Sequence, residues 1–311
     1  MIFIFTIATE WDRTPDTDKI SVKNIDRLHL VHDICISEGV RPTYLCSYEV
    51  AVSDSFKSFG ESIVKNNEGE IGSHLHPWST PPYIKNIDLK NNLCPFPNEY
   101  PLDVFESKLL NLKAELENRF CQQTSYRAGR FGFVSSHANI LKSNGYLIDS
   151  SVTPFCSWSR ARGLGYPSGP DYRKYDSNPF YWQDFDFKSP GLLELPISIF
   201  SNYPKICRFL SNGESKFAKK FTIAIRCQPN WLRPFPSNLD KLISIANVGI
   251  NQGHNVLCMM MHSNELHPYH NPYFTSEDLI NRLLFSLKRF FRYVKDANMQ
   301  CHTLSEFART H

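Results

Sequence analysis

Two histidines one residue apart, His74 and His76, follow a short apolar stretch in the segment GEIGSHLHPWST at residues 69–80. If this stretch is a strand, residues i and i+2 point to the same face, so both imidazoles would point to one place beyond the strand end. Neutral imidazole is a common ligand of zinc and related metals. By itself the pair also fits two ordinary polar loop residues, and the rest of the chain has to decide between these interpretations.

Further polar residues stand at the ends of other predicted strands. A carboxylate with two histidines is the protein half of an open catalytic metal site. A further histidine can protonate a leaving amine, and an arginine can hold a catalytic carboxylate in its charged form. If the strands are parallel, all these groups lie on one rim and suit the hydrolysis of an unactivated amide or ester. The candidates beside the histidine pair are Glu10, Asp12, Arg127, Asp149 and His262.

Strand-like and helix-like patterns alternate along the whole chain and would position these residues. Such alternation favours an α/β fold with parallel strands that close into a barrel or near-barrel. The predicted strands are Ile2–Ala8, Pro42–Cys46, Glu70–Leu75, Tyr146–Ile148, Leu192–Ile197, Phe221–Arg226 and Asn255–Met261, with a short strand end in 125–132. The predicted helices are Val22–Ser37, Ser53–Lys65, Leu102–Phe120, Val134–Ser143, Asn238–Asn251 and Thr275–Val294. We expect one domain over residues 1–311, with irregular insertions near 77–101 and 150–190.

Composition narrows the possible functions. With 41% hydrophobic and 21% charged residues the chain has an ordinary globular composition. A net charge of +3 predicts no strong electrostatic attraction to nucleic acids or membranes. We interpret the basic cluster Lys288–Arg292 as the solvated face of a helix. The nine cysteines are odd in number, widely spaced and without a C-x-x-C motif, which argues against a disulfide framework. No apolar run reaches the length of a membrane span, and the first is too short for a signal peptide, so we expect a cytoplasmic protein of undetermined oligomeric state.

The order of these motifs resembles the polysaccharide deacetylase family, the NodB-like carbohydrate esterases, and in particular members of bacterial surface-polysaccharide biosynthesis. The segments that carry the resemblance span about residues 2–265. They are FTIATEWD, GEIGSHLHPW, SYRAGRFG, GYLIDSSVTP with the later LLELP, and VLCMMMHSNE. The resemblance implies a distorted (β/α) barrel of about seven parallel strands, of the NodB-homology type.

The resemblance also implies roles for individual residues. Glu10, His74 and His76 would hold a divalent metal, most often Zn²⁺, with Co²⁺ or Ni²⁺ as alternatives. The family more often takes its second histidine four residues after the first, where this chain has Trp78. The remaining roles fall on Arg127, which would orient the catalytic base, on Asp149, which would support the site through hydrogen bonds, and on His262, the general acid.

One position departs from the family pattern. The general base would be an aspartate at the first acidic place of the first motif, and this chain has Ala8 there. Three interpretations are open: an alanine that inactivates an otherwise intact site, Asp12 as the base in a register shifted by two, or a natural protein that binds without catalysis. Measuring hydrolysis by Ala8→Asp, by Asp12→Asn and by the unchanged chain distinguishes these three interpretations.

Taken together, the resemblance implies a metal-dependent deacetylase that hydrolyses the N-acetyl group of an amino sugar in an O-antigen or capsule pathway related to lipopolysaccharide biosynthesis. The substrate would be nucleotide-linked, lipid-linked or an oligosaccharide. The alternatives are an N-deformylase and a non-catalytic carbohydrate-binding protein on the same fold. A nucleic-acid enzyme would need a basic groove, which the sequence does not indicate.

Overall fold

Seven parallel strands form the framework of the described chain. The computed structural model describes residues 1–13, 20–84, 95–159, 169–183, 191–211 and 228–311. The main sheet has the strand order β10-β1-β2-β3-β4-β5-β7-β6, all of it parallel except β6, and β11 runs parallel to β1. The bounds are β1 Ile2–Thr9, β2 Thr43–Cys46, β3 Glu70–Leu75, β4 Ser125–Ala128, β5 Ile148–Asp149, β6 Phe180–Tyr181, β7 Leu193–Glu194, β10 Val256–His262 and β11 Gln300–Cys301. The predicted α/β fold is confirmed.

The sheet curves into a distorted barrel that closes irregularly between β7 and β10. The backbone amide of Ser198 donates to the carbonyl oxygen of Cys258 at 3.0 Å. The backbone amide of Met260 donates to the carbonyl oxygen of Leu232 at 3.4 Å. Ser198 and Leu232 flank a small two-stranded sheet, β8 Ile199–Phe200 and β9 Asn230–Trp231. The predicted strand Leu192–Ile197 is shorter than expected because Pro196 has no N–H to donate to a ladder. The predicted strand Phe221–Arg226 lies outside the described residues.

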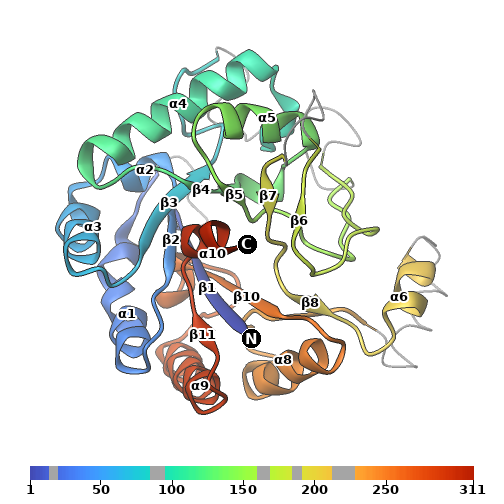
Figure 1. The fold of residues 1–311 in the computed structure, drawn as a ribbon. Helices are drawn as coiled ribbons and strands as arrows, with labels where there is room; N and C mark the ends of the chain where they lie inside the picture. Colours follow the sequence, from blue (N-terminus) through green and yellow to red (C-terminus); the bar gives the residue numbers. More distant parts are fainter. Residues whose placement is uncertain (14–19, 85–94, 160–168, 184–190, 212–227) are drawn as a thin grey trace.

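Helices surround the barrel (Figure 1). Apolar faces hold them there: Phe290 and Phe291 pack on Phe3 and Phe5, with ring centroids 5.0–6.0 Å apart. The bounds are α1 Leu28–Ser37, α2 Tyr48–Ala51, α3 Asp54–Asn66, α4 Leu102–Arg119, α5 Ser135–Ser143, α6 Pro204–Ser211, α8 Leu242–Asn251, α9 Glu277–Asp296 and α10 Leu304–Thr310. Among the described residues, no helix is long and apolar enough to cross a membrane.

The two ends of the barrel differ. The helix α10 lies over the N-terminal ends of the strands, where the amide of Leu304 donates to Thr43 Oγ1 at 3.0 Å and Ser305 Oγ lies 2.6 Å from Thr124 Oγ1 (Figure 1). The C-terminal ends of the strands therefore form the opposite rim, which carries the predicted site residues.

The first predicted helix, Val22–Ser37, begins differently from the expectation. A 3-10 helix occupies Lys23–Arg27 before α1 starts at Leu28. The carboxylate of Asp12 accepts from the backbone amides of Lys23 at 2.9 Å and Asn24 at 3.0 Å. An acid placed there satisfies N–H groups that a helix start leaves unpaired, which explains the tight first turn.

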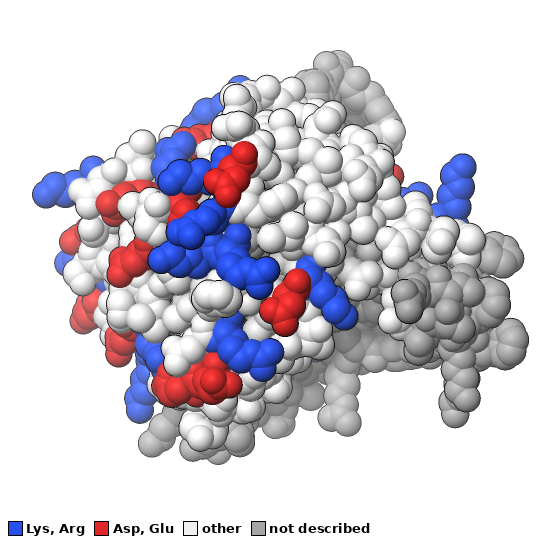
Figure 2. All heavy atoms as spheres, turned by 90° about the horizontal axis from the view of Figure 1, so that it is seen from below, with Lys and Arg blue, Asp and Glu red and all other residues white. Residues whose placement is uncertain are grey.

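The basic cluster of α9 lies on the surface. Lys288, Arg289 and Arg292 line a groove with Ile243 of α8. Lys and Arg side chains gather on the face seen from below, with Asp and Glu side chains between them (Figure 2). This mixture of charges agrees with the predicted solvated face.

Candidate active site

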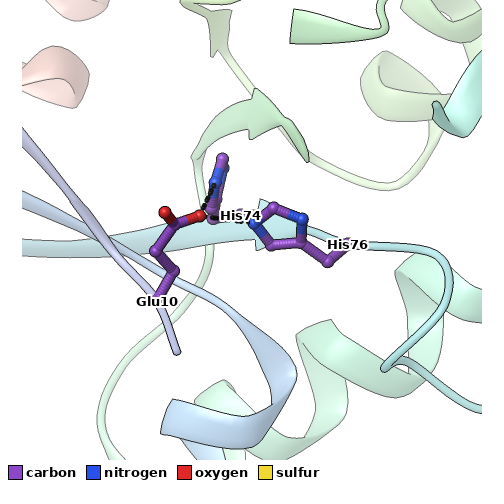
Figure 3. Close-up of side chains that lie close together, drawn as sticks. All are labelled: Glu10, His74 and His76. Carbon is purple, nitrogen blue, oxygen red and sulfur yellow. Dashed lines mark hydrogen bonds and ion pairs between the residues drawn. The ribbon is translucent and has the colours of Figure 1, made fainter. Parts of the chain in front are cut away.

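Glu10, His74 and His76 converge at the C-terminal rim of the barrel. Glu10 follows β1, His74 lies in β3 and His76 is the first residue after it. Both imidazoles point toward the carboxylate (Figure 3), with the Nε2 atoms of His76 and His74 at 2.8 Å and 3.6 Å from Glu10 Oε2. The potential ligand atoms all lie within 4.8 Å of one another, and the three side chains are buried. The i, i+2 spacing therefore does bring the two histidines together.

The protonation states of the three side chains fit a divalent metal. Nδ1 of His74 lies 3.0 Å from the carbonyl of Arg127, so this nitrogen donates and Nε2 keeps a free lone pair toward Glu10. Burial lowers the pKa of His74 to about 4 and also lowers the pKa of His76. Burial alone would raise the pKa of Glu10, but Arg13 and His262 hold it well below its usual value. Two neutral imidazoles and one carboxylate are the ligand state that a metal requires.

Two residues that support Glu10 were not predicted. Arg13 Nη2 donates to Glu10 Oε1 at 2.9 Å, and Asn264 Nδ2 donates to the same oxygen at 3.1 Å. The backbone amide of Glu10 donates to Ser263 Oγ at 3.1 Å. These partners come from segments just beyond β1 and β10. Their only signal in the sequence is their position after a predicted strand.

His262 lies at the end of β10, in register with Ala8 of β1. Its Nε2 is 3.9 Å from Glu10 Oε1, and its Nδ1 accepts from Arg233 Nη2 at 2.8 Å. An arginine can only donate, so a neutral His262 carries its proton on Nε2, on the side of Glu10. Burial and the adjacent Arg233 lower the pKa of His262 to about 4.

A buried ion pair lies beside His262. The side chain of Glu265 is buried and pairs with Arg233. Burial raises the pKa of Glu265, but Arg233 and His262 together bring it down to about 2. Arg233 itself was not predicted, because it follows a segment with no clear motif.

Ala8 and Arg127 face the same pocket. Arg127 is fully buried, and its side chain donates to Ser150 and, through Nη2, to Thr6 Oγ1 at 2.9 Å. Its second terminal nitrogen, Nη1, has no hydrogen-bond partner among the described residues. Thr6 and Ala8 share one face of β1, so this unpaired donor and the methyl group of Ala8 line one space.

The two other predicted acids lie away from the pocket. Asp12 binds the start of the first helix, as described above, and lies 2.9 Å from His270 Nδ1. The alternative that Asp12 serves as the base does not fit this arrangement. Asp149 accepts from Ser151 Oγ at 2.6 Å and neighbours Glu194, and burial raises the pKa of both carboxyl groups. Asp149 does not line the pocket, so its predicted support of the site is at most indirect.

The pocket that contains these groups has a volume of about 320 Å³. Its wall is rich in aromatic rings, and Trp78 lies 4.3 Å from the ring of His76. Trp78 and Trp158 line this pocket, where they could stack on a sugar ring, whereas Trp182 is buried among Phe133 and Phe180. The aromatic lining is Trp11, Trp78, Phe131, Trp158 and Tyr273.

Comparison with known proteins supports the assignment of the fold. The chain is similar over 99% of its length to a candidate polysaccharide deacetylase from Mycobacterium smegmatis, with a TM-score of 0.60, 14% identity and 89% of that chain covered. It is similar over 99% to a candidate glycoside hydrolase or deacetylase from Parabacteroides distasonis, with a TM-score of 0.64, 12% identity and 70% of that chain covered. An allantoinase matches over 99% with a TM-score of 0.51, 12% identity and 89% of that chain covered.

These structures share the NodB-like deacetylase fold with this chain, as the motifs predicted. At such low identity the likeness defines the fold and leaves the reaction open. No family model matches the sequence, and no curated protein matches it.

Proposed function

We propose that this protein has the active-site architecture of a carbohydrate deacetylase, with a divalent metal held by Glu10, His74 and His76. The observation that carries the proposal is the convergence of these three buried ligand groups in the lining of one pocket in a deacetylase fold. A metal bound there supplies Lewis-acid polarisation of an acyl carbonyl and a more acidic water. Two imidazoles and a carboxylate suit zinc, and cobalt or nickel would bind the same donors.

The side chains around the metal ligands suit amide hydrolysis in all but one position. The Nε2–H of His262 faces the same carboxylate as the two ligand histidines, where a proton can pass to a leaving amine. A base would have to take a proton from water, and Ala8 cannot. Ala8 lines the same pocket as buried Arg127, whose Nη1 has no hydrogen-bond partner among the described residues, and we propose that a carboxylate at position 8 would accept from it. We therefore propose that Ala8 interrupts a site that is otherwise assembled.

The substrate we propose is an N-acetylated amino sugar, nucleotide-linked, lipid-linked or within an oligosaccharide, with an N-formyl group as the alternative acyl group. The resemblance of the motifs to surface-polysaccharide members supports a place in an O-antigen or capsule pathway in the cytoplasm. A second candidate function is carbohydrate binding without catalysis. The observation that favours it is that Glu10, the metal ligand, is the only carboxylate among the described residues that line the pocket.

The test combines metal analysis with a gain of function. The purified chain is loaded with zinc, and release of acetate from acetylated amino sugars is measured for the unchanged chain and for Ala8→Asp. General-base catalysis contributes about 10²–10⁴-fold, so Ala8→Asp should raise hydrolysis by at least about 100-fold. Stoichiometric zinc without any gain from Ala8→Asp would establish the non-catalytic alternative. Failure to bind zinc would overturn the proposal.

A further inference from the structure

The pocket is far more positive than the chain as a whole. The full sequence has 34 basic and 31 acidic side chains, whereas the described pocket lining has the four arginines Arg13, Arg127, Arg130 and Arg233 against the single carboxylate of Glu10. Glu10 pairs with Arg13, and Glu265 outside the lining pairs with Arg233. A divalent metal on Glu10 would add further positive charge. Such a pocket concentrates field lines and attracts anions.

Arg130 is held in a backbone conformation that its side chain does not favour. Its φ is 51° and its ψ is 23°, the left-handed region where glycine is the usual residue, and the adjacent Phe131 has a φ of 60°. Strain of this kind persists when the surrounding structure enforces it, and it is common at functional sites. The preceding Gly129 lies close against the end of β3, because a Cβ there would overlap the carbonyl of Leu75 and the ring of His76. The turn is thus packed directly on a metal ligand.

The side chain of Arg130 reaches the pocket with no anionic partner among the described residues. Its guanidinium lies over the ring of Phe96, 5.1 Å from the centroid, and lines the pocket. No hydrogen bond or ion pair joins it to any residue that the structure describes, although Arg13 is close enough to add to the effect of burial and lower its pKa. A guanidinium presents a planar fork of donors that matches the two oxygens of a phosphate or carboxylate.

We propose that Arg130, together with Arg13, forms a binding subsite for an oxyanion on the sugar that enters this pocket. The substrate class is then an acetamido sugar that carries a phosphate or a carboxylate, and not a neutral glycan. This inference rests on the proposed function only in taking the ligand to be an amino sugar. A glycine would adopt the same backbone conformation with less strain, so a purely structural role does not explain the arginine at position 130. Binding of the ligand by its side chain does explain it.

The chain with Ala8 is not expected to consume a substrate, so the test is equilibrium binding by titration calorimetry on the zinc-loaded protein. The probes are N-acetylglucosamine, its 1-phosphate, N-acetylglucosaminuronic acid and inorganic phosphate. A charge-assisted hydrogen bond corresponds to at least about tenfold in affinity, so one or both anionic sugars should bind about tenfold more tightly than the neutral sugar at low salt. The difference should shrink as salt is added. The two anionic sugars distinguish a phosphate from a carboxylate as the source of the oxyanion.

Two substitutions at position 130 separate binding from folding. Arg130→Gln should reduce the preference for the anionic sugar to within about twofold, because a neutral side chain lacks the charge that strengthens the bond. Arg130→Gly should abolish the preference as well, while the melting temperature stays equal or rises because the strained backbone is relieved. Arg289→Gln on the surface of α9 is the matched control and should keep the full preference. Equal binding of neutral and anionic sugars, or an unchanged preference in Arg130→Gln, would overturn the inference.

Failure of this inference and failure of the proposed function give different results. If Ala8→Asp releases acetate from a neutral sugar and anionic sugars show no advantage, the proposed function stands and the subsite does not exist. If zinc does not bind but the preference for anionic sugars depends on Arg130, the subsite stands and the metal-dependent function fails.

Discussion

The arginines of α9 and Arg127 of the pocket have opposite surroundings. On α9, Arg289 and Arg292 are 51% and 62% exposed, and their carboxylate partners are Asp240 at 3.8 Å and Glu38 at 3.1 Å. In the pocket, Arg127 is completely buried and has an unpaired Nη1, and no carboxylate pairs with it in the described residues. The α9 cluster is contiguous in sequence, whereas the pocket arginines are spread from residue 13 to residue 233.

The difference shows that density of charge along the chain is a poor guide to function. Exposed ion pairs contribute about 0–1 kcal/mol, because water and salt already screen the charges. A buried charge without a partner costs far more, so it persists where a ligand or a missing side chain would complete it. Three predictions test this contrast between the pocket and the surface.

The largest effect is expected from removal of a metal ligand in the pocket. His74→Ala should weaken zinc binding by at least about 100-fold, since even partners that only orient a ligand cost 10–100-fold when changed. Metal content after dialysis measures this, with zinc falling from about one per chain toward zero. The matched control is His29→Ala, which removes an exposed histidine and should leave zinc bound. Full zinc retention in His74→Ala would show that the three groups do not form the metal site.

A smaller effect is expected from pairing Ala8→Asp with Arg127→Gln. The carboxylate that Ala8→Asp introduces should accept from the unpaired Nη1 of Arg127, so the two substitutions should couple by about 1–3 kcal/mol in unfolding free energy. Urea unfolding of the four members of the cycle gives this value.

The same cycle on Arg289→Gln and Asp240→Asn provides the surface comparison. Arg289 and Asp240 are 51% and 79% exposed, so their coupling should stay below about 1 kcal/mol. Equal coupling in the two cycles would contradict the contrast between pocket and surface.

An effect of about the size of the pocket coupling concerns pH and a buried histidine outside the pocket. His137 stacks on Phe105 with ring centroids 3.9 Å apart, and burial lowers its pKa to about 3. The unfolded chain binds a proton at this residue below its ordinary pKa of about 6.5, whereas the folded chain does so only near 3. Stability is therefore unaffected above pH 6.5 and falls as the pH decreases toward 3, by about 2 kcal/mol at pH 5.

His137→Phe should remove that part of the pH dependence. The measurement is the unfolding free energy from urea at pH 7 and pH 5, in the metal-free chain. His29→Ala again serves as the exposed control and should leave the pH dependence unchanged. A loss of stability at pH 5 that is as large in His137→Phe as in the unchanged chain would show that His137 is protonated freely in the fold.

Much of the fold was predictable because it depends on local patterns. The apolar run of β1 and the helical repeats of α4 and α9 define elements whose observed bounds differ from the predicted ones by one or two residues. One error lies where a distant group intervenes, because Asp12 holds the amides of Lys23 and Asn24. The other is local, because Pro196 within the predicted strand interrupts the ladder. Neither effect can be read from hydrophobic periodicity.

The sequence by itself determined which residues reach the rim, because the two-residue period of a strand places His74 and His76 on one side and Glu10 directly follows a strand. Only the tertiary structure decided their partners. Arg13, Arg233 and Asn264 join the site, while Asp12 and Asp149 turn to other hydrogen bonds. The physical reason is that periodicity specifies the side of an element on which a residue lies, whereas a hydrogen bond depends on which groups from distant segments lie within about 3 Å of it.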